Sequence, residues 1–228
     1  MIALIAAKEN SERVPNKNTK PFADTTLLEL KIRQLQTSCA FDQVVVSSDS
    51  KVLLDRAEKL GALPWERAAS LCQSDTPMGE VYHALADRFF GEFGDMPLAW
   101  VQCNNPLVEG PYYTKAVRAW NAKTDAYDCL VSVHRVHEYL IKDGQPFNFT
   151  RFPWGRSQDQ LPMYSLNFAI CILRARDMYN WSSLIGKRPL LFEIPRADAT
   201  DIDWPEDWAY CEAEYKLRNP ASCSYFAS

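Results

Sequence analysis

Three basic residues near the start of the chain could hold an anion. Lys8, Arg13 and Lys17 stand within ten residues of one another, with small polar residues such as Ser11 between them. Several cations and backbone N–H groups together bind a triphosphate, and a loop that leaves a buried strand offers both. Neither the Walker pattern nor the dinucleotide pattern G-x-G-x-x-G is present. By residue types alone, this loop is equally consistent with an anion site and with a solvated charged loop.

Two acidic residues near the other end of the chain could hold a metal ion. Asp201 and Asp203 flank Ile202, and residues two positions apart in an extended segment point to the same side. Mg²⁺ in proteins takes one or two carboxylates together with phosphate oxygens and water. As a bare pattern the pair is more typical of a turn or a helix cap, so spacing alone does not establish a metal site.

Apolar runs and amphipathic segments alternate along the chain and predict the elements that position these residues. Strands are predicted over 2–7, 44–46, 98–102, 128–133, 166–173 and 190–194, and helices over 26–35, 51–60, 79–90, 113–123 and 207–217. This alternation indicates βαβ units, and hence a mostly parallel sheet with helices on both faces. Ligands of such sheets bind at the carboxyl ends of the strands, so segments 8–18, 47–50 and 102–106 are expected to line a site.

Length and composition fit one globular domain over residues 1–228. The chain is 47% hydrophobic and 24% charged, close to the average for soluble proteins. Its net charge of −4 is spread without long runs of one sign, which argues against a nucleic-acid partner. The first apolar run ends at Lys8, too soon for a signal peptide or a membrane span. Seven cysteines without a C-x-x-C pair indicate buried free thiols, so we expect a cytoplasmic protein without a membrane partner.

Residues 136–165 differ from the rest of the chain. They are rich in aromatic residues and prolines and show no clear period, which predicts an excursion beside the sheet, either a lid or a dimerisation arm. We interpret its aromatic residues as packing against a dimer partner in preference to lining a sugar site: Phe147, Phe149, Phe152 and Trp154. The three histidines, His83, His134 and His137, are too dispersed for a zinc site.

The ordered set of motifs resembles the acylneuraminate cytidylyltransferase family over nearly the whole chain. The opening run 2–8 and the segment 11–18 resemble the start of that family's sequences, and further matches follow in the expected order: 20–22, 41–49, Arg67, Leu71, 75–76, Gln102, 106–107, 164–169, 185–189 and 201–203. The chain departs from the family at several places. Ala68 replaces the Pro that follows an Arg, and a family Arg aligns near Gln158, where Arg156 could substitute for it. Lys8 replaces an Arg, Glu9-Asn10 replaces a Gly-Gly pair, and Phe168 replaces the Gly of an N-G-A motif.

The resemblance implies a Rossmann-like nucleotidyltransferase fold and transfer of CMP from CTP to a small acidic, sialic-acid-like sugar, with release of pyrophosphate by a homodimer. It implies catalytic roles for Lys8, Lys17 and Asp203, and Mg²⁺ at Asp201 and Asp203. Ligand contacts are implied for a larger set, in which Gln102, Asn104 and Asn167 are assigned to the acceptor sugar: Ala6, Ala7, Asn10, Ser11, Arg13, Asn18, Arg67, Gln102, Asn104 and Asn167.

Three alternatives stay open at this point. A related nucleotidyltransferase could act on Kdo, another nonulosonate, a phosphonate, or a sugar phosphate with GTP. The chain could instead be a non-catalytic nucleotide-binding paralogue in which Glu9 repels the triphosphate. A flavodoxin-like binding module would show no preference for nucleoside triphosphates.

Overall fold

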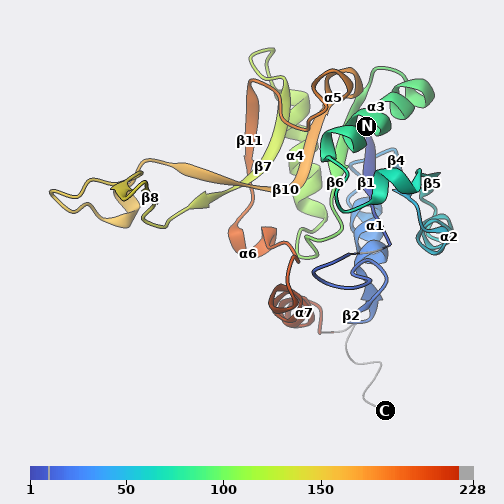
Figure 1. Ribbon diagram of the computed structural model, residues 1–228, viewed down its shortest axis with the longest axis horizontal. Coiled ribbons are helices and arrows are strands. Elements are labelled where there is room, and N and C mark those ends of the chain that lie inside the picture. The colour runs from blue at the N-terminus through green and yellow to red at the C-terminus, as the bar shows by residue number, and fades with distance from the viewer. Residues whose placement is uncertain (10, 221–228) are drawn as a thin grey trace.

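A seven-stranded sheet forms the centre of the molecule (Figure 1). The computed structural model describes residues 1–9 and 11–220. The strand order is β11-β7-β10-β6-β1-β4-β5, and β10 runs antiparallel to both its neighbours while the other pairs are parallel. The strands of this sheet are β1 (Ile2–Ala6), β4 (Gln43–Ser48), β5 (Leu63–Glu66), β6 (Pro97–Val101), β7 (Cys129–Val136), β10 (Met163–Arg174) and β11 (Pro189–Glu193). The prediction of a mostly parallel α/β fold is confirmed.

Helices cover both faces of the sheet, as the sequence predicted. One face packs against α1 (Leu27–Thr37), α2 (Lys51–Lys59), α4 (Gly110–Ala122) and α7 (Pro205–Arg218), and the other against α3 (Met78–Phe93) and α5 (Ala175–Trp181). Strand β1 explains why both faces are covered. The side chains of Ala3 and Ile5 belong to the apolar core under α1, α2, α4 and α7, and those of Ile2 and Leu4 belong to the core under α3 and α5. A strand buried on both faces has to be apolar at every position, which is the pattern of its sequence.

Helix ends follow local chemistry. The Thr26 side chain accepts a hydrogen bond from the backbone N–H of Glu29, so Thr26 caps α1 and the helix begins one residue later than predicted. Gly61, with φ of +77°, follows the end of α2. Several elements escaped prediction, among them the edge strand β5 and helix α5 as well as shorter pieces: β2 (Pro21–Phe22), β3 (Thr25–Thr26), η1 (Ala69–Cys72) and α6 (Arg196–Ala199). Among the described residues, none of the helices has the length and apolar character that crossing a membrane requires.

Residues 136–165 project from the sheet as a long arm (Figure 1). Strands β7 and β10 continue into its base, where Met163 pairs with Val136, and its outer part holds β8 (Ile141–Lys142), β9 (Gln145–Pro146) and η2 (Ser157–Asp159). The predicted excursion is therefore present, although its base is a regular ribbon and both strands are longer than predicted. Pairing between strands far apart in the chain leaves no period in the local sequence.

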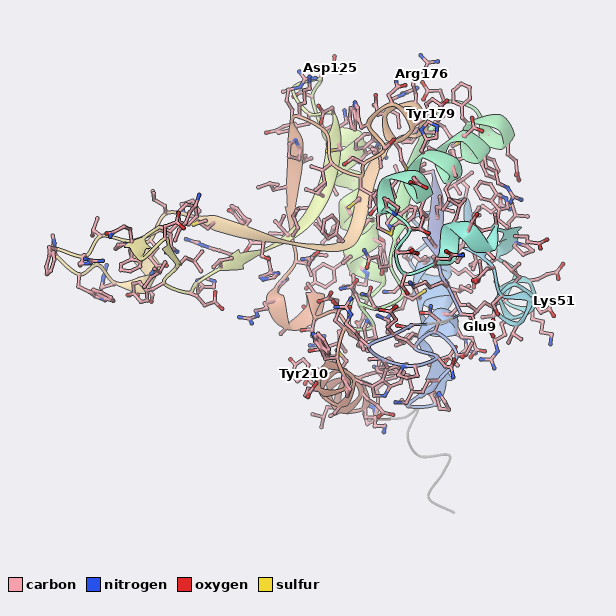
Figure 2. All side chains as sticks on the ribbon, viewed as in Figure 1. Glu9, Lys51, Asp125, Arg176, Tyr179 and Tyr210 are labelled. Atoms are coloured by element: carbon pink, nitrogen blue, oxygen red, sulfur yellow. The ribbon has the colours of Figure 1, made fainter. Side chains whose placement is uncertain are left out.

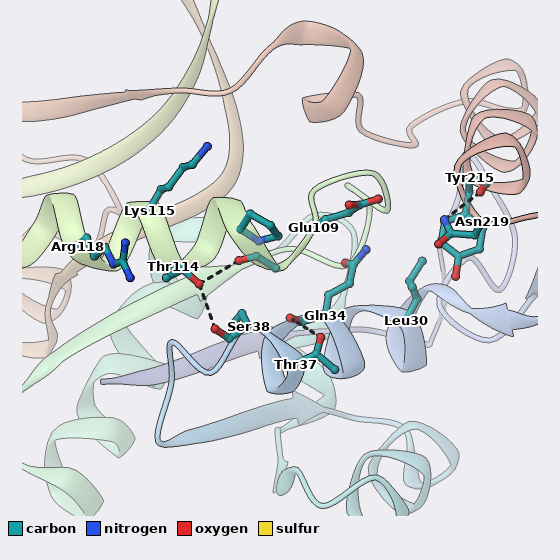
Figure 3. Close-up of a pocket in the computed structure, with 12 residues that line it drawn as sticks. Leu30, Gln34, Thr37, Ser38, Glu109, Thr114, Lys115, Arg118, Tyr215 and Asn219 are labelled. Atoms are coloured by element: carbon teal, nitrogen blue, oxygen red, sulfur yellow. Dashed lines mark hydrogen bonds between the residues drawn. The ribbon is translucent and has the colours of Figure 1, made fainter. Parts of the chain in front are cut away.

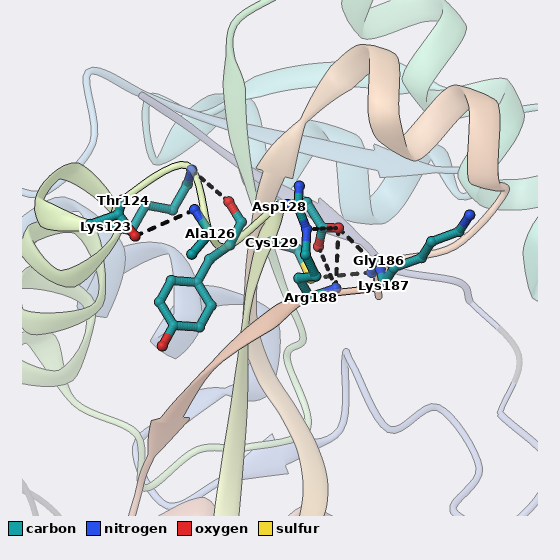
Figure 4. A network of polar contacts seen from close by, with 9 residues as sticks. Lys123, Thr124, Ala126, Asp128, Cys129, Gly186, Lys187 and Arg188 are labelled. Carbon is teal, nitrogen blue, oxygen red and sulfur yellow. Dashed lines mark hydrogen bonds and ion pairs between the residues drawn. The ribbon is translucent and has the colours of Figure 1, made fainter.

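The segment 185–189, one of the family-like motifs, leads into the edge strand β11 and is hydrogen-bonded to the start of the neighbouring β7 (Figure 4). The Asp128 carboxylate accepts hydrogen bonds from the backbone N–H groups of Lys187 and Arg188, both at 3.1 Å. Gly186 has no room for a side chain, because a Cβ there would lie 2.3 Å from Asp128 Oδ1 and 2.7 Å from the Trp181 ring. The glycine therefore serves the attachment of β11 beside β7.

Candidate active site

A cleft of about 570 Å³ opens at the carboxyl ends of the central strands. Its lining comes from the loops after β1, β5 and β6, from α3, from β10 and from the segment before α7. This position confirms the expectation for an open α/β sheet. One predicted segment was wrong, because none of residues 47–50 lines the cleft. Ser47, Ser48 and Ser50 are buried, and Asp49 Oδ1 accepts a hydrogen bond from the backbone N–H of Glu9.

Most of the predicted site residues meet in this cleft: Ala6, Lys8, Ser11, Arg13, Lys17, Asn18, Arg67, Gln102, Asn104, Asp201 and Asp203. Two do not line it. Ala7 has its side chain in the core, and its carbonyl oxygen accepts a hydrogen bond from Arg67 Nη2 at 3.0 Å. Asn167 is buried, with Oδ1 hydrogen-bonded to the hydroxyl of Ser132 at 2.5 Å. Asn10 lies outside the described residues.

The N-terminal loop folds back on itself to bring its cations into the cleft. Val14 is 2% exposed and anchors the loop in the core, while Asn18 Nδ2 donates to the carbonyl oxygen of Lys8 at 2.9 Å. Asn16, with φ of +54°, accepts a hydrogen bond from the Thr19 backbone N–H in the turn that reverses the chain. Asparagine is among the residues that tolerate this left-handed conformation.

The acidic pair faces the same cleft. Asp201 and Asp203 line it, whereas Ile202 between them is fully buried, so the prediction that both carboxylates point to one side is confirmed. Asp203 Oδ2 accepts a hydrogen bond from Arg13 Nη1 at 2.9 Å, and Asp203 Oδ1 lies 3.7 Å from Lys17 Nζ. Lys17 also donates to the carbonyl oxygen of Ile202 at 2.6 Å. These contacts join the two ends of the chain in one site.

Burial and mutual repulsion shape the charges of this site. Burial, followed by the charge of Asp203, raises the pKa of Asp201. Burial lowers the pKa of Lys17, and the charge of Asp203 opposes that effect. The cleft therefore combines cations that attract an anion with two neighbouring carboxylates whose repulsion a cation would relieve.

A fully buried lysine supports the loop after β6. Lys31 Nζ donates to the carbonyl oxygen of Asn105 at 2.8 Å and to the Tyr113 hydroxyl at 2.6 Å, and burial lowers the pKa of Lys31 to about 7. The loop in turn holds the acidic segment, because Asn104 O accepts a hydrogen bond from the Ile202 backbone N–H at 2.8 Å. Lys31 interrupts the apolar stripe of its helix between Leu30 and Ile32, which is the one sign of this role in the sequence.

One whole side of the cleft is apolar, with three aromatic rings. Its members are Leu71, Met78, Val81, Tyr82, Trp100 and Phe168. Leu71 and Phe168 were singled out from the sequence, and the other four were not. Three further lining residues were not anticipated: Cys72, Gln73 and Ser74. Glu12 and Cys103 also line the cleft and lie in segments 8–18 and 102–106, which were expected to do so, and Thr76 lies in the family-like motif 75–76. Apolar residues at helical spacing look the same whether they face a core or a cleft, so the pattern of α3 gave no warning.

Other residues that the sequence singled out lie away from the cleft. Glu9 is exposed and does not line it, although its carboxylate was expected beside the triphosphate (Figure 2). His83 stacks against Tyr179, with ring centroids 4.0 Å apart. Phe149 and Trp154 pack against each other in the arm, with ring centroids 5.1 Å apart. The structure thus does not support a sugar-lining role for these aromatic rings in the cleft.

A second cavity, of about 600 Å³, lies between α1, the start of α4 and the end of α7 (Figure 3). It shares no lining residue with the cleft and lies on the helical layer, away from the carboxyl ends of the strands. Two donors on its wall already have protein partners, since Thr114 Oγ1 donates to Ser38 O at 3.0 Å and Gln34 Nε2 to Pro106 O at 2.7 Å. We therefore place the candidate active site in the cleft.

Comparison with known proteins agrees with this geometry. The sequence pattern of the cytidylyltransferase family matches residues 2–144. Pseudaminic acid cytidylyltransferase from Campylobacter jejuni is 36% identical, over 97% of this chain and 98% of that protein. CMP-N,N'-diacetyllegionaminic acid synthase from Legionella pneumophila is 29% identical, also over 97% and 98%. A solved CMP:2-keto-3-deoxy-manno-octonic acid synthetase shares the fold, with a TM-score of 0.69 at 13% identity over 95% of this chain and 98% of that one. The chain belongs to the cytidylyltransferase family.

Proposed function

We propose that this protein transfers CMP from CTP to a nonulosonic acid and releases pyrophosphate. One observation carries the proposal: the cations Lys8, Arg13 and Lys17 meet the carboxylates of Asp201 and Asp203 in a single cleft at the carboxyl ends of the strands. Cytidylyltransferases for pseudaminic and N,N'-diacetyllegionaminic acids match the chain along nearly its whole length, which supports a nonulosonic acid as the acceptor.

The side chains of the cleft suit a displacement at phosphorus. Lys8, Arg13 and Lys17 would neutralise the triphosphate and hold its α-phosphorus in line with a hydroxyl of the sugar. A bond forms between that oxygen and the α-phosphorus, the bond to the β-phosphate oxygen breaks, and the hydroxyl proton passes to solvent. Gln102 and Asn104, which follow β6, would orient the acceptor sugar.

We further propose that Asp201 and Asp203 hold Mg²⁺ together with the triphosphate. Within residues 1–9 and 11–220, no group of three or more His, Cys, Asp or Glu side chains could enclose a metal ion by itself. Two carboxylates leave the other coordination positions to phosphate oxygens and water, which is the arrangement that Mg²⁺ favours. When bound, the ion would supply charge neutralisation at the phosphates. Asp203 already accepts a hydrogen bond from Arg13, so the cations and the carboxylates would share the triphosphate between them.

Pyrophosphate release tests the proposed function directly. With Mg²⁺ present, we expect release from CTP but not from ATP, GTP or UTP, and with nonulosonic acids in preference to Kdo. Turnover with a different nucleotide or with Kdo alone would favour the alternative of a related nucleotidyltransferase. No release from any pair, together with no thermal shift by CTP and Mg²⁺, would contradict the proposal. The non-catalytic alternative has lost its main support, because Glu9 does not line the cleft.

We propose that the arm joins two copies of the chain. It exposes large apolar side chains that a monomer would leave in water: Ile141, Phe147, Phe152, Trp154 and Leu161. Phe152 is 87% exposed and Leu161 is 73% exposed. Contiguous exposed apolar surface is typical of protein interfaces. A homodimer would bury this surface.

Light scattering measures this association. We expect a dimer for the wild type and a monomer for the double variant Phe152→Ser/Leu161→Ser, because two apolar contacts would be replaced by hydroxyls. The variant Phe90→Ser removes an exposed ring from α3 and should leave the mass unchanged. A wild-type monomer at micromolar concentration, or an unaltered dimer in the double variant, would argue against the arm as the interface.

We also propose that the protein works in the cytoplasm. The cysteines that the structure describes are all free thiols, and Cys103, Cys129, Cys171 and Cys211 are buried. Free thiols persist in reducing compartments. This observation supports the location that the sequence suggested.

A further inference from the structure

Phe168 adopts a backbone conformation that few residues other than glycine adopt. Its φ is +51°, in the left-handed region, where a Cβ crowds the neighbouring carbonyl group. It lies in an irregular part of β10, where the register with β7 shifts between Leu166 and Cys171. Backbone strain of this kind concentrates at binding sites and persists only where the surroundings enforce it.

Buried hydrogen bonds on both sides of Phe168 enforce its conformation. Asn167 Oδ1 accepts from the Ser132 hydroxyl at 2.5 Å and from the Ala169 backbone N–H at 3.2 Å. Ser132 Oγ accepts from the Ile170 backbone N–H at 3.0 Å. Asn167 and Ile170 are therefore tied to Ser132 of β7, which holds the backbone at Phe168 and sets the direction of its Cα–Cβ bond.

The ring of Phe168 completes the apolar side of the cleft. It packs on the same core as Tyr82 and Leu71, and all three line the cleft. Tyr82 stands edge-on to Trp100, with ring centroids 5.0 Å apart, so the wall is rigid and aromatic. Burial raises the pKa of Tyr82 to about 12, which keeps its hydroxyl protonated at neutral pH.

The sheet order places Phe168 at one end of the cleft. Arg67 follows β5, while Phe168 lies in β10, and β6, β1 and β4 separate the two strands. With strands spaced about 4.8 Å apart, the two ends are roughly 19 Å apart. The phosphate-binding cations follow β1 in the middle, and Gln102 and Asn104 follow β6, which neighbours β10. Phe168 therefore flanks the end that the proposed function gives to the acceptor.

We propose that Phe168 is a specificity-determining residue, which selects acceptor sugars with a methyl-bearing substituent, such as a second N-acetyl group, over sugars with a hydroxyl at that position. The inference rests on the proposed function. A methyl group against the ring of Phe168 loses its contact with water, which is favourable. A hydroxyl in the same place would lose its water without gaining a hydrogen-bond partner on the ring, which is unfavourable.

Two substitutions test the inference without disturbing the backbone. Glycine and asparagine both tolerate positive φ, so relief of backbone strain offsets part of the packing that the ring loses, and Phe168→Gly and Phe168→Asn should fold. We would measure kcat/KM at saturating CTP and Mg²⁺ with a diacetamido nonulosonic acid and with N-acetylneuraminic acid. The wild type should prefer the first acceptor, and both variants should lose roughly tenfold or more of this preference. The KM for CTP should change less than twofold.

The outcomes separate this inference from the proposed function. If the wild type releases pyrophosphate but the variants keep its preference within twofold, or lose turnover equally with both acceptors, Phe168 is only a packing residue and the inference is overturned. If the wild type releases none with either acceptor, the proposed function fails and the inference fails with it. Phe90→Ala, which removes an aromatic ring from α3 outside the cleft, is the matched control and should leave the preference unchanged.

Discussion

Replacing Asp203 by alanine should lower the rate of pyrophosphate release by about a hundredfold or more, the order observed when a charge-stabilising group is removed from an active site. Asp203 lines the cleft and contacts Arg13 and Lys17, so the change removes a carboxylate from the place where the triphosphate is proposed to bind. Its side chain is 31% exposed. Partly exposed ion pairs contribute about 0–1 kcal/mol, so the free energy of unfolding should change little.

Calorimetric titration with CTP gives this prediction a second readout. Without Mg²⁺, the Asp203 carboxylate repels the triphosphate, so Asp203→Ala should bind CTP at least as tightly as the wild type. Adding Mg²⁺ should strengthen binding in the wild type but much less in the variant. The matched control is Asp198→Ala. Like Asp203, Asp198 forms an ion pair with an arginine, with Oδ1 2.7 Å from Arg218 Nη1, but it lies outside the cleft. Wild-type turnover in Asp203→Ala would remove the metal assignment.

Replacing Lys31 by methionine should destabilise the protein by about 1–3 kcal/mol at pH 8.5, as the balance of two effects. Three buried acceptors would lose their donor at about 1–3 kcal/mol each: the carbonyl oxygens of Asn105 and Val108 and the hydroxyl of Tyr113. Against this loss, folding would no longer deprotonate the Lys31 amine, whose pKa falls from 10.5 to about 7, which at pH 8.5 costs the wild type about 2.7 kcal/mol. Methionine has a similar length and no branch, so little of the loss should come from a cavity. Urea unfolding at pH 8.5 measures the difference. Lys51→Met is the control, because the Lys51 side chain is 87% exposed.

The same lysine should make stability depend on pH. Its pKa is about 7 in the folded protein and 10.5 in an ordinary environment, so the unfolded chain binds more protons between these values. Stability must then rise with pH through this window, with a slope approaching about 1.4 kcal/mol per pH unit. Conversely, it falls as the pH decreases from 10.5 towards 7, where the buried amine becomes charged.

Unfolding midpoints measured from pH 7 to 8.5 isolate this slope. The upper limit matters, because burial raises the pKa of Cys103 from 9.0 to about 12, so this thiol lowers stability as the pH rises above 9. From pH 7 to 8.5, the free energy of unfolding should rise in the wild type and in Lys51→Met. In Lys31→Met the share of this rise that comes from Lys31 should be absent. If the free energy of unfolding rose equally with pH in all three proteins, Lys31 would not change its protonation on unfolding between pH 7 and 8.5.

The sequence alone determined the layered fold and the two clusters of charged residues. Strand β1 is apolar throughout because both its faces are buried. Helix α1 has apolar residues along one side only, because only that side is buried. Such patterns repeat every two residues or every three to four, so they are visible in a short stretch of chain. The same local rule put Asp201 and Asp203 on one side of an extended segment.

Only the tertiary structure decided which of these residues meet. Arg13 and Asp203 are 190 positions apart, and their contact depends on the order of the strands between them. Lys31 looks like an ordinary helical lysine until the loop at Asn105 covers it. Phe168 reaches the cleft because β10 runs antiparallel and shifts its register against β7. Strand order, register and burial arise from contacts between distant segments, and no local spacing encodes them.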